Sequence, residues 1–340
     1  MPLEQFQDLC IARTGSAGLQ ARSKGEKKVA SAKNSGRSNA GLKGPHYPSH
    51  SDGVAAAHEG ASIMATAVRQ PAVAGRFYPA NAQHLRAEVE TYTTVRADAS
   101  AESEPRIRAM GCIVPHAGYV YSGHVAGAVY RRLDLPRRMV ILCPNHTGMG
   151  EPLAIMSEGA WHTPLGDALI DEAMANQLKS RMPLLAEDQA AHRYEHALEV
   201  QLPFLQVLAP GFRFVPITVG TSNFDALSAL GVVIGSVAGE AGEPVLVIAS
   251  SDMNHYESDD ITRVKDRRAI DRILALDPRG LYETVHQANI SMCGYGPAVV
   301  MLTAAKKLGA TQAELVRYAT SGDVSGDRDM VVGYAGIAVY

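Results

Sequence analysis

The stretch GCIVPHAGYVYSGHVAGAVY, residues 111–130, changes character at Pro115. The apolar and β-branched run that precedes the proline is typical of a buried strand. His116 follows the proline directly, and a loop rich in glycine and tyrosine leads into a helical pattern over 123–132. Strand, polar turn and helix in this order indicate one unit of an α/β fold.

The same alternation continues along the chain. Short apolar runs predict strands at 107–115, 138–144, 153–157, 212–220, 244–252 and 330–340. Helical patterns cover 82–95, 123–132, 167–180, 195–208, 224–237, 260–276 and 297–308. We therefore predict a single α/β domain over residues 69–340, with a mostly parallel or mixed central sheet flanked by helices.

The amino-acid composition argues against several classes of protein, including nucleic-acid-binding, membrane-spanning and disulfide-rich proteins. An apolar fraction of 46% and a charged fraction of 20% are those of a soluble globular protein with a sizeable core. The net charge of −3 excludes a global field that would attract nucleic acid or an anionic membrane. The four cysteines form no C-x-x-C pair, which argues against a disulfide framework and favours a reducing cytoplasm. The longest apolar runs are too short for a transmembrane helix.

Residues 1–68 differ from the rest. They are rich in Lys, Arg, Ser, Gly and Ala and hold few large apolar residues, so we expect a disordered basic extension. An organelle transit peptide is one alternative. Another is that translation starts at Met64, which would make the preceding residues a mis-called extension.

Three predicted strands are followed by polar side chains. The first leads to His116, the second to Asn145 and His146, and the third to Ser251, Asp252 and His255. Ligands of α/β sheets bind at the carboxyl ends of strands. A single histidine there is ordinarily a capping or surface residue, but three together predict one pocket.

Cys293 precedes a helix whose first turn contains Pro297. A helix N-terminus stabilises a thiolate, and flanking glycines set this cysteine in a loop. Cys112 and Cys143, by contrast, lie inside predicted strands and are interpreted as small buried hydrophobes.

His192, Glu195 and His196 form an H-x-x-E-H pattern, the inverted zinc-peptidase motif. On one helix its histidines could bind zinc, which keeps a zinc peptidase open as a remote alternative. The pattern is short, and Pro203 limits the helix. Glu195, His196 and Glu199 are better interpreted as lining or bracing the pocket.

The chain also resembles a known family. RQPAVAGRFYP, VPHAGYVYSG, PNHTG, EHALEVQLPFL, SSDMNH, MCGYGP and SGDVSGDRDMVVGYAGI, in this order between Arg69 and Tyr340, resemble the Memo family, also called AmmeMemoRadiSam system protein B. The family is similar in fold to the class III extradiol dioxygenases, which are non-haem iron enzymes.

The resemblance implies roles for individual residues. His116 and His146 match two metal ligands, and Cys293 matches the third position, which is a glutamate in the dioxygenases. His255 matches a catalytic histidine, accompanied by Asp252, which we expect to orient its ring. Iron(II) or copper is the expected metal, and a thiolate also suits zinc. Because thiolate replaces carboxylate, dioxygenase activity itself does not carry over.

Two functions follow from this resemblance. The first is a metal-dependent redox protein, dioxygenase-like in its site, whose substrate is held by Tyr119, Tyr121, His196 and Glu199. The second is a non-catalytic adaptor that binds a peptide or phosphopeptide in the same pocket, although only Arg131, Arg132, Arg137 and Arg138 suggest a basic rim. The family's prokaryotic name implies companionship with a radical-SAM protein and an AMMECR1-domain protein. The sequence leaves the substrate and turnover open.

Overall fold

The computed structural model describes residues 67–94 and 105–340. Ala65–Tyr340 form one compact unit. The predicted disorder of residues 1–66 and the alternative start at Met64 lie outside the described residues. Val68, the last residue of the predicted extension, pairs with Ala160 in strand β1.

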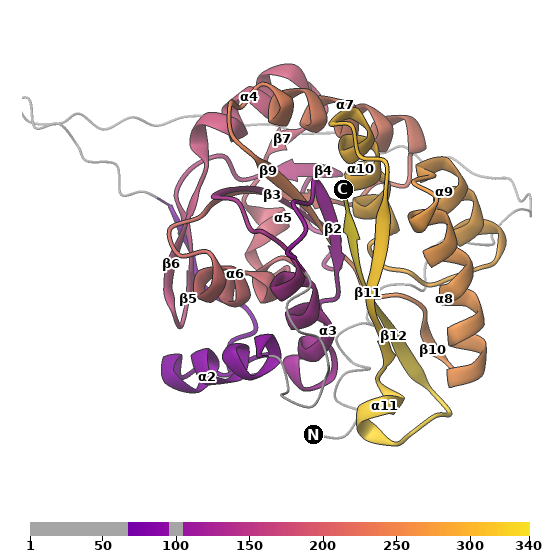
Figure 1. The fold of residues 1–340 in the computed structure, drawn as a ribbon. Coiled ribbons are helices and arrows are strands. Elements are labelled where there is room, and N and C mark those ends of the chain that lie inside the picture. The colour runs from indigo at the N-terminus through magenta and orange to yellow at the C-terminus, as the bar shows by residue number, and fades with distance from the viewer. Residues whose placement is uncertain (1–66, 95–104) are drawn as a thin grey trace, which may run out of the picture. The chain divides into compact units, whose positions relative to one another are not determined.

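A mixed sheet forms the centre of the unit (Figure 1). Its strands, as far as the chain is described, are β1 (Val68–Arg69), β2 (Gly111–Val114), β3 (Arg138–Pro144), β4 (Leu153–Ile155), β5 (Ala160–Thr163), β6 (Gly166–Ile170), β7 (Ala186–Glu187), β8 (Arg213–Val219), β9 (Val245–Ser250), β10 (His255–Glu257), β11 (Ala313–Thr320) and β12 (Val331–Val339). Their order is β1-β5-β6-β8-β3-β9-β2-β12-β10, with β11 on β12 and β4 on β8.

The middle of the sheet is parallel. β6, β8, β3, β9 and β2 are parallel neighbours, whereas β12 joins β2 antiparallel and β4 joins β8 antiparallel. Every residue of β9 is buried, and so is every residue of β3 after Arg138. Strands covered on both faces have continuous apolar runs, which is why these two were readable from the sequence. The predicted mixed α/β fold is confirmed.

Helices cover both faces of the sheet (Figure 1). They are α2 (Ala82–Thr93), α3 (Tyr119–Arg132), α4 (Glu172–Arg181), α5 (Ala190–Arg193), the 3-10 helix η2 (Glu199–Gln201), α6 (Leu202–Leu208), α7 (Phe224–Gly239), α8 (Asp259–Leu274), α9 (Pro278–Gln287), α10 (Tyr295–Lys307) and α11 (Gly322–Ser325). α10 packs on β9, β2 and α7, while α3 packs on β12, β11 and α2. Within the described ranges, no helix has the length and hydropathy needed to cross a bilayer.

Glycines allow α7 and α10 to approach closely. A Cβ atom on Gly231 would lie 2.6 Å from Thr303 Cβ, and one on Gly235 would lie 2.7 Å from Lys307 Cβ. Because real Cβ contacts are longer, the two helices can be this near only where one of them lacks side chains. α10, which begins two residues after Cys293, is thereby held against α7 through its C-terminal half.

Two predicted helices begin later than expected. Residues 166–170 belong to β6 rather than to a helix, and α4 begins only after Asp171, whose carboxylate accepts the Met174 N–H. The predicted helix over 195–208 becomes η2 followed by α6, with Pro203 in the first turn of α6. Helix α9 has no counterpart among the predicted elements.

A buried ion pair joins the start of the unit to the segment 192–199. Arg69 donates from Nη1 to Glu199 Oε2 at 2.5 Å, from Nε to the His192 carbonyl at 2.9 Å and from Nη2 to the Glu195 carbonyl at 2.7 Å. Its guanidinium lies 4.1 Å above the Trp161 ring. The segment is therefore held at three points by one side chain.

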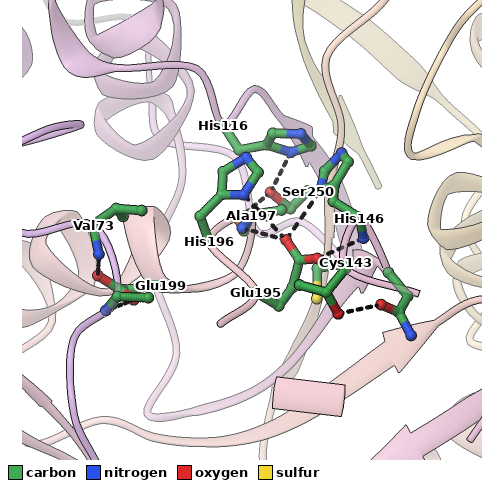
Figure 2. A network of polar contacts seen from close by, with 12 residues as sticks. Val73, His116, Cys143, His146, Glu195, His196, Ala197, Glu199 and Ser250 are labelled. Carbon is green, nitrogen blue, oxygen red and sulfur yellow. Dashed lines mark hydrogen bonds and ion pairs between the residues drawn. The ribbon is translucent and has the colours of Figure 1, made fainter. Parts of the chain in front are cut away.

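Glu199 is fully engaged in this anchor. Besides Arg69, its carboxylate accepts hydrogen bonds from the backbone of Ala72 and Val73 and from the Tyr78 hydroxyl at 2.6 Å. Figure 2 shows Glu199 beside Val73 and apart from the histidines. Its predicted contact with substrate is therefore wrong, because the carboxylate braces the fold instead.

We expect Glu199→Gln to lower the free energy of unfolding by about 3 kcal/mol, because Arg69 would remain buried without a counter-charge. Urea unfolding followed by circular dichroism measures this. Arg267→Met, which breaks the exposed Arg267–Asp271 pair, is the control and should change stability by less than about 1 kcal/mol. Equal effects of the two substitutions would contradict the anchor.

Candidate metal site

Three parallel strands deliver polar residues to one edge of the sheet. β2 leads to His116, β3 to His146 and β9 to Asp252. Since β9 pairs in parallel with both β2 and β3, their carboxyl ends lie side by side. Cys293 reaches the same edge from the loop before α10, although it is 177 positions from His116 in the chain.

The side chains meet closely. Cys293 Sγ lies 3.2 Å from His116 Nε2, and the ligand atoms of His116, His146 and Cys293 all lie within 4.8 Å of one another. The His146 ring stacks on that of His196 at 4.7 Å between centroids, and the His116 ring stands edge-on to both. Figure 2 shows the three imidazoles gathered above Glu195. The sulfur of Cys293 and one ring nitrogen each of His116 and His146 are thus close enough together to bind the same metal ion.

His116 is held by its second ring nitrogen. Its Nδ1 lies 3.0 Å from Ser250 Oγ, which in turn donates to the Ala197 carbonyl at 2.6 Å. Gln201 Nε2 donates to the same hydroxyl at 2.8 Å. These contacts leave Nε2 directed at Cys293.

His146 is held by a carboxylate. Its Nδ1 lies 3.0 Å from Glu195 Oε1, and its backbone N–H donates to Oε2 at 2.6 Å. Burial is the largest single influence on the pKa of His146 and acts to lower it, but the charges and hydrogen bonds of Glu195 and Cys293 together outweigh burial and raise that pKa. Burial acts to raise the pKa of Glu195, yet the neighbouring imidazoles and the Ala197 N–H lower it to about 2. The carboxylate is therefore ionised and stabilises positive charge on the His146 ring.

The other groups of the cluster favour their uncharged forms. Burial is the largest cause that lowers the pKa of His116, and it lowers that of His196 to about 4. Burial also raises the pKa of the Cys293 thiol, partly offset by His146. Neutral imidazole nitrogens are the form of histidine that binds metals.

His255 lies beside this cluster with a ring oriented by Ser291. Its Nδ1 is 2.8 Å from the Ser291 carbonyl, so Nδ1 carries the proton and Nε2 is left as the acceptor. Its backbone N–H donates to Ser291 Oγ at 2.8 Å. Burial lowers the pKa of His255 to about 4. Tyr256, the next residue, has a φ of 60°, a strained value for a non-glycine residue, and it lies where the pairing of β10 with β12 shifts register.

Asp252 has a different partner from the predicted one. Its Oδ1 accepts the backbone N–H of His116 at 2.7 Å, and its Oδ2 lies 4.0 Å from His116 Nε2. Burial raises its pKa to about 6. The prediction that Asp252 orients His255 is wrong, because the Ser291 carbonyl occupies that position.

The two predicted substrate tyrosines are placed differently. Tyr119 is buried, donates its hydroxyl to the Val200 carbonyl at 2.7 Å and packs on Phe204. It belongs to the core, so its predicted contact with substrate is wrong. Tyr121 is half-buried and packs against Val125 and Tyr334. Its role stays a prediction.

The H-x-x-E-H pattern does not form a peptidase site. α5 ends at Arg193, so His192 and His196 do not share a helix face. His192 is buried, with Nδ1 2.9 Å from Thr218 Oγ1 and its ring against Trp161. Among the described residues, the ligand atoms of His146, Glu195 and His196 lie close enough together to hold one metal ion. His192 is not part of such a group.

Sequence reasoning missed two residues of the site. Ser250 and Gln201 are fully buried and join His116 to the backbone of Pro115 and Ala197. Ser250 is the last residue of an apolar strand, and Gln201 interrupts the apolar run EVQLPFL. A polar residue inside a buried run is the signal that could have identified them, because such a group must find a partner.

Fold and site together define a mixed α/β protein with a histidine–cysteine cluster at the carboxyl edge of its sheet. The model of the family described as Memo-like protein matches residues 69–338. The chain belongs to this Memo family.

Several archaeal proteins are similar over most of the chain. A MEMO1 family protein of Methanothermobacter thermautotrophicus is 42% identical over 275 residues, which cover 79% of this chain and 99% of that protein. A MEMO1 family protein of Methanopyrus kandleri is 45% identical over 276 residues, covering 79% and 98%. Among solved structures, the uncharacterized protein JW3007 of Escherichia coli K12 matches with a TM-score of 0.44 at 11% identity, covering 66% of this chain and 99% of that one.

Behind His255 lies a buried carboxyl group. Asp266 of α8 accepts the Asn254 backbone N–H at 2.8 Å and the Tyr318 hydroxyl at 2.7 Å. Asn254 Oδ1 in turn accepts two hydrogen bonds from Ser291, the residue that orients His255. Burial raises the pKa of Asp266 to about 7.

We expect Asp266 to make stability fall with rising pH. Since its folded pKa exceeds the ordinary value of 3.8, the folded chain binds the extra proton between about pH 4 and pH 7, and the stabilisation is lost as pH rises through 7. Asp266→Asn should flatten the decline in unfolding free energy between pH 5 and pH 7.5, measured by urea titration. A decline equally steep in the variant would assign it to other groups.

Proposed function

We propose that the protein binds a transition metal, iron or copper, through His116, His146 and Cys293 and carries out metal-dependent redox chemistry on a small substrate. The observation that carries the proposal is the 3.2 Å separation of Cys293 Sγ from His116 Nε2, with all three ligand atoms within 4.8 Å. Ligand atoms around one ion are a few ångströms apart, because each lies about 2.0–2.3 Å from the metal.

The donor set fits such an ion. Two imidazoles and a soft thiolate suit iron, copper and zinc better than magnesium or calcium, which prefer oxygen. Each histidine contacts a hydrogen-bonding partner through Nδ1, Ser250 for His116 and Glu195 for His146. Metal-binding histidines are characteristically oriented in this way.

His255 would serve as the base of the reaction. Its Nε2 is the accepting nitrogen, and burial favours the neutral ring, so Nε2 would be available to accept a proton from a substrate hydroxyl that the bound metal makes more acidic. The metal, when bound, would supply Lewis-acid and one-electron chemistry beside it. Asp252 would fix the backbone of His116 while this occurs.

The first test measures metal content after anaerobic purification by inductively coupled plasma mass spectrometry. We expect close to one equivalent of iron or copper in the wild type and less than a tenth of that in the double variant His116→Ala, Cys293→Ala. Cys112→Ala removes a thiol inside β2 and should keep the metal. Equal content in wild type and double variant would rule the site out.

The second test concerns the support of His146. Because Glu195 holds the ring through Nδ1, Glu195→Gln should weaken metal affinity by about 10–100-fold. Competition with a metal chelator measures the change. Glu187→Gln, which alters a carboxylate bound to Lys179 and Ser157, should leave affinity unaltered. Unchanged affinity in Glu195→Gln would mean that this carboxylate supports the fold alone.

A further inference from the structure

A second concave site lies at the start of the folded unit. It is a cavity of about 620 Å³, a size typical of small-molecule sites. Its described walls are Ala67, Val68, Arg69, Gln70, Pro71, Ala72, Arg76, Met156, Gln189, Arg193 and Tyr194. None of these residues belongs to the histidine–cysteine cluster.

The charged residues that line this cavity are all positive. Three arginines and no aspartate or glutamate occur among its described lining residues. Arg69 is neutralised by Glu199, which leaves Arg76 and Arg193 as the effective charges. Neither of these two has a carboxylate within ion-pair distance in the described part of the chain, and Arg76 donates one hydrogen bond to the Ala72 carbonyl. Two guanidinium groups in one recess favour an anion.

The cavity borders the candidate metal site, although its described lining includes none of the cluster residues. Arg193 and Tyr194 line the cavity, whereas the next two residues, Glu195 and His196, contact His146. Phe77, adjacent to Arg76, has its ring 4.8 Å from that of His196. A single segment thus forms one wall of each site.

We propose that this cavity binds a small organic anion, a carboxylate or phosphate ester, whose acid group is held by Arg76 and Arg193. Guanidinium groups bind both acids through paired, charge-assisted hydrogen bonds. Gln70, Gln189 and Tyr194 provide neutral donors and acceptors for the remainder of the ligand. The proposal is independent of any metal.

The chain's own residues 1–66 are a poorer occupant. They contain eight Lys or Arg against five Asp or Glu, so their net charge has the same sign as the cavity. An external anion is complementary in charge, whereas this segment is repelled overall.

The test is calorimetric titration of the full-length protein with phenyl phosphate and with benzoate, in low-salt buffer free of other polyvalent anions. Benzamide is the uncharged analogue of benzoate. We expect binding of both acids and at least tenfold weaker binding of benzamide. The double variant Arg76→Gln, Arg193→Gln should weaken both acids at least tenfold.

The matched control is Arg213→Gln, Arg268→Gln, which removes the same charge from two exposed arginines elsewhere. Acid binding should persist in it. No binding by the wild type, equal loss in both double variants, or equal affinity for benzamide would overturn the proposal. Should Arg76→Gln, Arg193→Gln unfold, the single variant Arg193→Glu at an exposed position must still abolish acid binding. Metal content, measured on the same samples, reports separately on the proposed function.

Discussion

The buried pair of Arg69 and Glu199 fixes the part of the chain on which the candidate site depends. Arg69 also binds the carbonyl oxygens of His192 and Glu195, so it determines the path of the backbone between them. This segment makes no long helix of its own, since α5 is four residues long. Without an intrahelical ladder, its backbone needs partners from elsewhere, and one guanidinium satisfies several of them.

From this fixed segment, contacts extend to both histidines that face the cysteine. Glu195 reaches the ring and the backbone of His146, and the Ala197 carbonyl accepts the Ser250 hydroxyl, which holds His116. The parallel strands bring these histidines to a common edge, but strand ends alone leave the rotation of each ring undetermined. The rotation follows from hydrogen bonds to the second nitrogen. A salt bridge at the start of the unit and the geometry of the cluster are therefore linked.

The sequence predicted the structure correctly where a single physical rule determines the residue pattern. Buried parallel strands appear as continuous apolar runs, and the residues after them lie at the sheet edge, so His116 and His146 could be placed near each other from patterns alone. The pairing of Cys293 with them came from family resemblance. Roles that depend on long-range contacts were misassigned, as with Tyr119, Glu199 and the partner of Asp252. Nothing local distinguishes a glutamate that braces Arg69 from one that faces a pocket.

The charge of Glu195 connects the fold to the proposed chemistry. Its carboxylate is fully buried and accepts hydrogen bonds from two backbone N–H groups and from His146, and among the described residues no Lys or Arg pairs with it. A buried carboxylate without a positive partner is costly, and an imidazole is that partner here. A proton on His146 or a cation at its other nitrogen would place positive charge on the same ring. Glu195 would therefore favour the proposed metal at His146 by the same electrostatics that stabilises the imidazolium.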